Sequence, residues 1–160
     1  DGMDLDKEKY LLGQGSDGKE HDTYIRVGAT TTLLSDSLVS GFSEFGEKTV
    51  DLFAPGTAIY STFPGNKYQS GSGTSFATPV VAGIAALLKS YFPSLKAKQI
   101  KEILMKSVYK PDVMVAPPLA SGIQNKMRFS KMSKSGGIVN AYNAVKLADK
   151  MTRKKLSLQQ

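Results

Sequence analysis

Residues 71–79 read Gly71-Ser72-Gly73-Thr74-Ser75-Phe76-Ala77-Thr78-Pro79, and the hydrophobic pattern of the chain changes at this point. Upstream, the apolar residues form short runs typical of strands, whereas the downstream stretch 80–88 is apolar on nearly every side and predicts a buried helix. A helix that begins at Thr74 or Ser75 presents unpaired backbone N–H groups and the positive end of its macrodipole. A serine at that position suits acyl transfer, because the tetrahedral intermediate carries an oxyanion that these groups stabilise.

This stretch has three other interpretations. The serines and threonine at 72, 74 and 75 are residue types that cap the start of a core helix. A phosphate-binding Walker loop needs a Gly-Lys pair before its Ser or Thr, and no lysine precedes Ser75. The nucleophile elbow of α/β-hydrolases needs Gly-x-Ser-x-Gly, which Thr74-Ser75-Phe76-Ala77 does not supply. Helix capping is therefore the main structural alternative to a nucleophile.

The residues before this stretch predict strands. Apolar runs at 24–29 and 49–53 end at glycine or proline, and a third run at 58–63 meets the turn signal Pro64-Gly65-Asn66. The segment 67–70 follows that turn, so 58–70 predicts a hairpin. Residues 1–23 are polar and glycine-rich, and we expect them to form a loop.

The residues after this stretch predict helices separated by a long loop. Ser94 fits the N-cap of a helix that places Ile100, Ile103, Leu104 and Ser107 on one face. Prolines and glycines recur through 108–137, which predicts a long loop. A closing helix is expected within 138–150, where Ala141, Ala144, Val145 and Ala148 would face inward, and a basic tail within 151–160. Strands joined to buried helices indicate the α/β class.

Several of these segments together resemble the subtilases, a family of serine proteases. The serine motif of that family is Gly-Thr-Ser, a hydrophobic residue and Ala-[Ser/Thr]-Pro, and residues 73–83 are similar to it throughout. Other segments follow the order of the family: Val27-Gly28-Ala29, Phe42-Ser43-Glu44-Phe45-Gly46, residues 50–56, Ile59-Tyr60-Ser61-Thr62 and residues 137–145. The resemblance covers residues 24–107 and 136–147. It implies a three-layer subtilisin-like fold with a parallel sheet between helices.

The resemblance also implies a function and a set of site residues. The reaction is peptide-bond hydrolysis through an acyl-enzyme on Ser75, whose N–H forms half of an oxyanion hole that Thr74 supports from behind. Phe76 would lie beside the leaving-group side. An extended peptide or protein substrate would be bound by main-chain hydrogen bonds along one edge. The expected substrate-binding residues are Gln69, Ser70, Gly71, Ser72, Gly73 and Phe76.

The base that this chemistry requires is missing. A serine hydroxyl needs a base and a carboxylate that orients the base, and subtilases supply them from Asp and His-Gly-Thr motifs that this sequence lacks. The only histidine, His21, is followed by Asp22-Thr23 and a strand, so a surface-loop histidine is the better interpretation. Asp4 and Asp6 have no hydrophobic strand before them. We therefore expect residues 1–160 to be the C-terminal half of a subtilase catalytic domain, inactive without the missing N-terminal half.

That hypothesis makes a physical prediction. If half of the domain is absent, strands or helix faces of this chain should leave apolar surface uncovered. A closed core with no such surface would contradict it.

Composition excludes several other classes of function. The chain has no cysteine and one histidine, so disulfides, thiol catalysis and a multi-histidine metal site are excluded within it. Residues 1–48 carry ten acidic and five basic side chains (net −5), and residues 49–160 carry four and sixteen (net +12). The lysines are scattered without interleaved aromatics, so nucleic-acid binding is not expected. No apolar stretch is long enough to cross a membrane.

Two hypotheses of different classes remain from the sequence. The first is a serine endopeptidase domain of which this chain is a part. The second is a non-catalytic subtilase-like module retained for binding or assembly. The family resemblance alone allows calcium, although no acidic loop has a recognisable ligand spacing. It also suggests a secreted or periplasmic protein.

Overall fold

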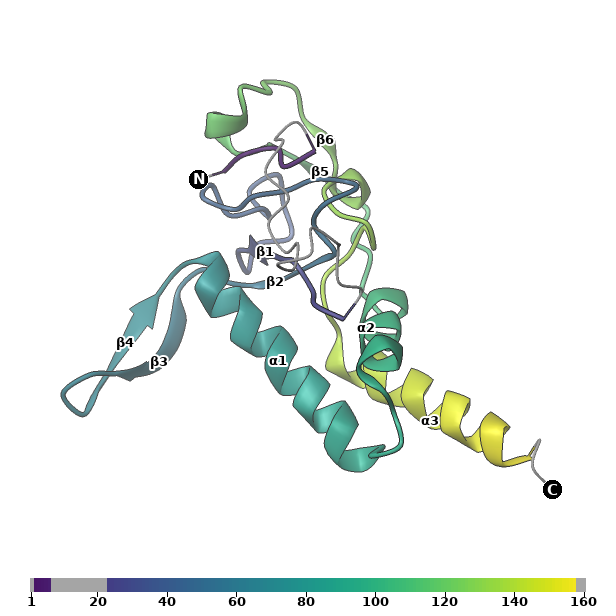
Figure 1. Ribbon diagram of the computed structural model, residues 1–160. Helices are drawn as coiled ribbons and strands as arrows, with labels where there is room; N and C mark the ends of the chain where they lie inside the picture. The colour runs from purple at the N-terminus through teal and green to yellow at the C-terminus, as the bar shows by residue number, and fades with distance from the viewer. Residues whose placement is uncertain (1, 7–22, 158–160) are drawn as a thin grey trace, which may run out of the picture.

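A pair of short parallel strands and three helices form the framework of the chain (Figure 1). The computed structural model describes residues 2–6 and 23–157. The elements, in chain order, are β1 (Val27–Thr30), β2 (Leu52–Pro55), β3 (Ile59–Phe63), β4 (Lys67–Gly71), α1 (Thr74–Tyr91), α2 (Ala97–Lys106), β5 (Met114–Val115), η1 (Leu119–Ser121), β6 (Met127–Arg128), η2 (Phe129–Lys131) and α3 (Ala141–Ser157).

The parallel pair separates two hydrophobic cores. β1 and β2 pair from Val27↔Leu52 to Thr30↔Pro55, and the second edge of β2 is bonded to residues 137–139. Because side chains alternate along a strand, Leu52 and Ala54 pack against the three helices, whereas Phe53 faces the opposite side. On that opposite side, irregular segments within 38–50 and 113–138 provide the second core, where Phe53 contacts Phe129 with ring centroids 5.2 Å apart.

The predicted hairpin is present. β3 and β4 pair antiparallel from Ile59↔Gly71 to Phe63↔Lys67, and Gly65 and Asn66 in the turn adopt positive φ values of 79° and 57°. Glycine and asparagine tolerate this conformation better than other residues, which explains why this turn signal was reliable. In Figure 1 the hairpin lies at the N-terminal end of α1 and extends away from the sheet and the helices.

Several predicted boundaries were wrong. Ser94 is not the N-cap of α2, because residues 92–95 form a turn whose Pro93 and Leu95 carbonyls accept from the Lys89 ammonium. The helix begins instead after Lys96, whose backbone N–H donates to the Gln99 side chain. The predicted loop 108–137 contains the β5–β6 pair and two short 3-10 turns. Residues 151–157 belong to α3 rather than to a tail.

Helix α1 is less buried than its composition predicts. The sequence predicts a helix enclosed on nearly every side, but only Ala77, Val81 and Leu88 are buried. On the other side of the helix Ala82, Leu87 and their neighbours are exposed. The expectation of uncovered apolar surface is therefore met on this helix. Across residues 2–6 and 23–157, no helix has the length and apolar character to cross a bilayer.

A buried carboxylate connects the starts of the two strands to α2 and to the segment after β6. Asp51 has a side chain 2% exposed, and its Oδ2 accepts a 2.8 Å hydrogen bond from the Arg26 N–H. The ammonium groups of Lys101 and Lys134 each lie 3.5 Å from one of its oxygens. A buried charge is tolerated only when it is paired in this way, so Asp51 should be sensitive to substitution.

We predict that Asp51→Ala lowers the free energy of unfolding by about 3 kcal/mol, because it leaves two ammonium groups and a backbone N–H without their shared partner. Urea denaturation of the chain followed by circular dichroism measures this. Asp112→Ala is the matched control: its carboxylate also pairs with a cation, Arg128, but is 90% exposed, so the change should stay within about 0.5 kcal/mol. Equal effects of the two substitutions would contradict the structural role of Asp51.

Candidate active site

The carboxyl ends of β1 and β2 hold the start of α1 through two hydrogen bonds in series. The Gly56 N–H, directly after β2, donates to the Thr30 carbonyl at the end of β1 over 3.0 Å. The Gly56 carbonyl accepts from the Gly73 N–H over 2.8 Å. Residues 71–75 therefore form a corner at the carboxyl edge of the parallel pair, which is where open α/β sheets place their ligands.

Glycine is required at two places in this corner. A Cβ on Gly56 would lie 2.7 Å from the Ala29 Cβ and 2.8 Å from the Gly73 oxygen, closer than van der Waals contact allows. A Cβ on Gly71 would overlap the ring of Phe76. Nothing in the sequence around Gly56 reveals this contact, because Gly73 is 17 positions away.

Ser75 lies in the first turn of α1 and is exposed. Among the described residues its hydroxyl has no hydrogen-bond partner, and its N–H has no acceptor, since the first backbone bonds of the helix run from Phe76 and Ala77 to the Gly73 carbonyl. A free N–H at the start of an 18-residue helix is placed to stabilise a negative charge. The local geometry therefore suits a nucleophile with one oxyanion donor.

The capping alternative does not agree with this geometry. The N-cap residue is Gly73, and no side chain caps the helix. The Ser72 Oγ accepts instead from the Ala58 N–H over 2.9 Å, which attaches the corner to the start of the hairpin. The Thr78 hydroxyl donates to the Thr74 carbonyl over 2.9 Å and so reinforces the first turn from within. Among the described residues, the hydroxyls of Thr74 and Ser75 remain without a hydrogen-bond partner, and that of Ser75 is exposed.

Aromatic contacts attach the hairpin to the residue after Ser75. The rings of Phe63 and Phe76 stack with centroids 6.3 Å apart, and Phe76 covers Gly71 at the end of β4. Five of the predicted substrate-binding residues are consecutive in the sequence. Gln69, Ser70 and Gly71 lie in β4, and Ser72 and Gly73 lie between β4 and α1. Since β4 pairs only with β3 within the described part of the chain, its other edge is open there.

The described residues bring no base to Ser75. His21 lies outside them. Asp6 is occupied elsewhere, because its carboxylate accepts from the Lys48 N–H at 3.0 Å and the Thr49 hydroxyl at 2.7 Å. The nearby Asp4 carboxylate accepts from the Asp6 N–H. These contacts hold the N-terminal segment to residues 45–49.

The described carboxyl groups whose pKa values are clearly shifted lie on the surface and not at residues 71–75. The Lys126 ammonium, by its hydrogen bond and its charge, lowers the pKa of the Asp36 carboxyl, and Lys106 lowers the pKa of Glu102 in the same way. Within residues 2–6 and 23–157, no three acidic or histidine side chains form a group able to hold a metal ion. Calcium stays a prediction from the family resemblance.

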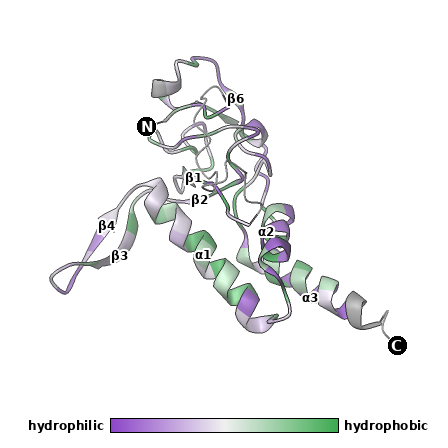
Figure 2. Cartoon of the chain, viewed as in Figure 1, coloured by the Kyte–Doolittle hydropathy of each residue, from purple (hydrophilic) through white to green (hydrophobic). Residues whose placement is uncertain are grey.

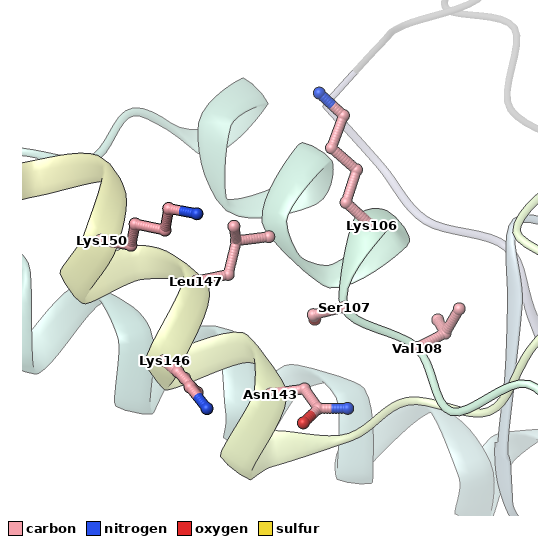
Figure 3. A pocket seen from close by; sticks show the side chains of 7 residues that line it. All are labelled: Lys106, Ser107, Val108, Asn143, Lys146, Leu147 and Lys150. Carbon is pink, nitrogen blue, oxygen red and sulfur yellow. The ribbon is translucent and has the colours of Figure 1, made fainter. Parts of the chain in front are cut away.

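A hollow between α2 and α3 is separate from this corner. It has a volume of about 290 Å³, and no residue of α1 lines it; Lys106, Lys146 and Lys150 are at its rim and Leu147 lies between them (Figure 3). Two of the ammonium groups already have partners, since Lys106 donates to Glu102 and Lys146 lies 5.9 Å from the centre of the Tyr142 ring. In Figure 3 the ends of Lys106 and Lys146 point in opposite directions, so they do not converge on one anion.

Known proteins resemble this chain both in sequence and in structure. The Subtilase family model matches residues 9–146. Subtilisin DY from Bacillus licheniformis is 42% identical over 85 residues, which cover 53% of this chain and 30% of that protein. Subtilisin-like protease SBT3.10 from Arabidopsis thaliana is 32% identical over 137 residues, covering 76% of this chain and 18% of that protein. The chain thus spans less than a third of the length of these curated relatives.

The solved structures agree with the sequence matches. The A-subunit of the AB5 toxin from E. coli superimposes with a TM-score of 0.66 and 26% identity, over 92% of this chain and 48% of that one. A cold adapted subtilisin-like serine proteinase superimposes with a TM-score of 0.53 and 36% identity, over 66% of this chain and 36% of that one. The predicted subtilisin-like α/β fold is therefore confirmed.

The close contact at Gly56 gives a test of the corner. We predict that Gly56→Ala lowers the free energy of unfolding of the chain by about 2 kcal/mol, because the methyl group displaces α1 from the strand ends. Gly83→Ala is the matched control: Gly83 is an exposed residue of α1, and a Cβ there would have nothing within 4 Å, so the substitution should stabilise the chain by about 1 kcal/mol through helix propensity. Chemical denaturation of both variants decides the point, and a neutral Gly56→Ala would show that the contact is dispensable.

Proposed function

The chain belongs to the subtilase family, and we propose on that premise that it carries the nucleophile of a serine endopeptidase. The observation that supports this most directly is the state of Ser75. Its hydroxyl and its N–H are both free of partners among the described residues, at the start of a long helix and in a corner that glycines hold against the strand ends. The N-cap position belongs to Gly73, so Ser75 is not needed to cap the helix.

In the proposed reaction the Ser75 Oγ attacks the carbonyl carbon of the scissile peptide and gives its proton to a base. The carbonyl oxygen takes up the negative charge and accepts a hydrogen bond from the Ser75 N–H. Collapse of this intermediate breaks the C–N bond, and the proton returns from the base to the leaving amine. Water then attacks the acyl-enzyme in the same way and releases the acid, which restores the Ser75 hydroxyl.

The base, the carboxylate that orients it and a second oxyanion donor would come from a part of the catalytic domain that these residues do not include. The chain covers 48% of the A-subunit of the AB5 toxin and 30% of Subtilisin DY, which supports a domain larger than the 160 residues. We propose that the chain is the C-terminal half of such a domain and that it does not hydrolyse peptides alone. A serine hydroxyl without a base is a weak nucleophile.

The proposed substrate is an extended segment of a peptide or protein. Its main chain would lie along the open edge that runs from Gln69 to Gly73, with the leaving-group side against Phe76. Thr74 would support the oxyanion hole from the side away from the substrate. By analogy with the family we also propose that the protein is secreted or periplasmic.

The proposal is tested with a fluorophosphonate probe, which bonds covalently to an activated serine. In the full-length protein we expect rapid labelling of Ser75 that Ser75→Ala abolishes and that Ser90→Ala leaves unchanged, since Ser90 is exposed near the other end of α1. The isolated chain should stay unlabelled. Mass spectrometry of the labelled peptide identifies the site.

Two outcomes would contradict parts of the proposal. A full-length protein that folds but neither reacts with the probe nor cleaves casein would support the non-catalytic binding module instead. Rapid labelling of Ser75 in the isolated chain would mean that the chain contains its own base, and the proposed dependence on another segment would be wrong.

A further inference from the structure

The outward face of the β3–β4 hairpin carries two stacked tyrosines. Tyr60 is 70% exposed and Tyr68 is 60% exposed, yet their ring centroids lie 5.8 Å apart and the ring planes differ by 24°. Because side chains alternate along a strand, this face is opposite to the one where Phe63 stacks on Phe76. Tyrosine is enriched where proteins bind other polypeptides, since its ring offers apolar area and its hydroxyl a polar group.

The tyrosine pair belongs to neither hydrophobic core of the chain. Among the described residues, the members of both cores lie outside residues 59–71, and Figure 2 shows mainly hydrophilic and neutral colours along β4. A cross-strand aromatic contact helps to hold a hairpin together, but this one leaves more than half of each tyrosine in water. That surface is available to a partner.

The open edge of β4 connects the pair to the corner that holds Ser75. The proposed substrate-binding segment runs from Gln69 to Gly73, and Tyr68 directly precedes it in β4. The ring of Phe76, beside which the leaving group is expected, covers Gly71 at the end of the same strand. The hairpin therefore lies on the leaving-group side, and the substrate residues after the scissile bond are the ones that reach β4.

A peptide that adds a strand along this edge would place every second side chain on the tyrosine face. Side chains directly opposite each other on neighbouring strands have Cβ atoms about 4.5–5.5 Å apart, so one substrate residue would lie against the ring of Tyr68. Tyr68 is five positions before Gly73, a length of about 17 Å in an extended chain. The substrate residue opposite Tyr68 is then roughly five residues after the scissile bond.

We propose that Tyr68, supported by Tyr60, is a specificity-determining residue that binds an aromatic or β-branched side chain of the substrate roughly five residues after the scissile bond. Such side chains pair favourably with an aromatic residue across neighbouring strands. The stack with Tyr60 holds the Tyr68 ring in place before the substrate arrives, which lowers the entropy lost on binding. The proposal rests on the proposed function, because it places the substrate on the edge that leads away from Ser75.

The first test is a cleavage profile of the full-length protein on a peptide library from a digested bacterial proteome, with the products identified by mass spectrometry. Aromatic and β-branched residues should be enriched roughly twofold or more at one position among about the fourth to sixth after the scissile bond. Tyr68→Ser should abolish this enrichment, and Tyr68→Phe should retain it because the ring is kept. A profile without the enrichment, or one that Tyr68→Ser leaves unchanged, overturns the inference.

The second test compares two peptides with the same preferred sequence, ending about two and about eight residues after the scissile bond. Tyr68→Ser should raise KM for the longer peptide about fivefold, leave its kcat unchanged and leave both constants of the shorter peptide unchanged. Tyr91→Ser is the matched control, because Tyr91 is 72% exposed at the far end of α1, and it should alter neither peptide. An equal effect of Tyr68→Ser on both peptides would mean that the ring only stabilises the hairpin, and the inference would be wrong.

A binding experiment separates this inference from the proposed function. Full-length Ser75→Ala protein, immobilised, should retain library peptides rich in aromatic and β-branched residues, and a further Tyr68→Ser substitution should remove that preference. If the protein has no peptidase activity but this retention still depends on Tyr68, the proposed function fails and the role of Tyr68 as a peptide-binding residue stands. Cleavage of peptides with no dependence on Tyr68 has the opposite meaning.

Discussion

The hydrogen bond from the Gly73 N–H to the Gly56 carbonyl, 2.8 Å long, joins the helical part of this protein to its sheet. It fixes the first residue before α1 against the end of β2, and the absence of a Cβ on Gly56 lets the two backbones meet. From that point the helix must run back along the sheet, which buries Ala77, Val81 and Leu88 against Ala29, Leu52 and Ala54. Ser75 is held at the opposite, exposed side of the same first turn.

This constraint also fixes the position of the corner at residues 71–75. A nucleophile must be held within a fraction of an ångström of its working position, and a helix terminus packed on strand ends provides that support. The hairpin adds a second attachment through the stacked rings of Phe63 and Phe76 and the bond from Ala58 to Ser72. The corner is thus held by the sheet on one side and the hairpin on the other.

The features that sequence could predict are those that depend on neighbours in the chain. The hairpin followed from Gly65 and Asn66, and the start of α1 followed from the change of hydrophobic period at Thr74. The features it missed depend on distant contacts. Ser94 has the right chemistry for an N-cap, but the carbonyls beside it are held by Lys89 in a turn, so the helix begins later. The β5–β6 pair and the buried ion pairs of Asp51 likewise join segments far apart in sequence.

The prediction that α1 is buried on nearly every side was the most informative error, because it followed from the composition of the helix itself. A helix without a polar side chain between Thr78 and Lys89 is typical of a protein interior, yet among the residues that the structure describes only one side of it is buried. Covering the exposed side would remove apolar surface from water at roughly 25 cal/mol per Å², so a polypeptide packed there would stabilise the helix further. The same helix carries Ser75 in its first turn, so a segment packed against the exposed side near that turn would also border Ser75. Under the proposed function the base and Ser75 come from different segments, so the pair that the reaction requires would form only where those segments pack together.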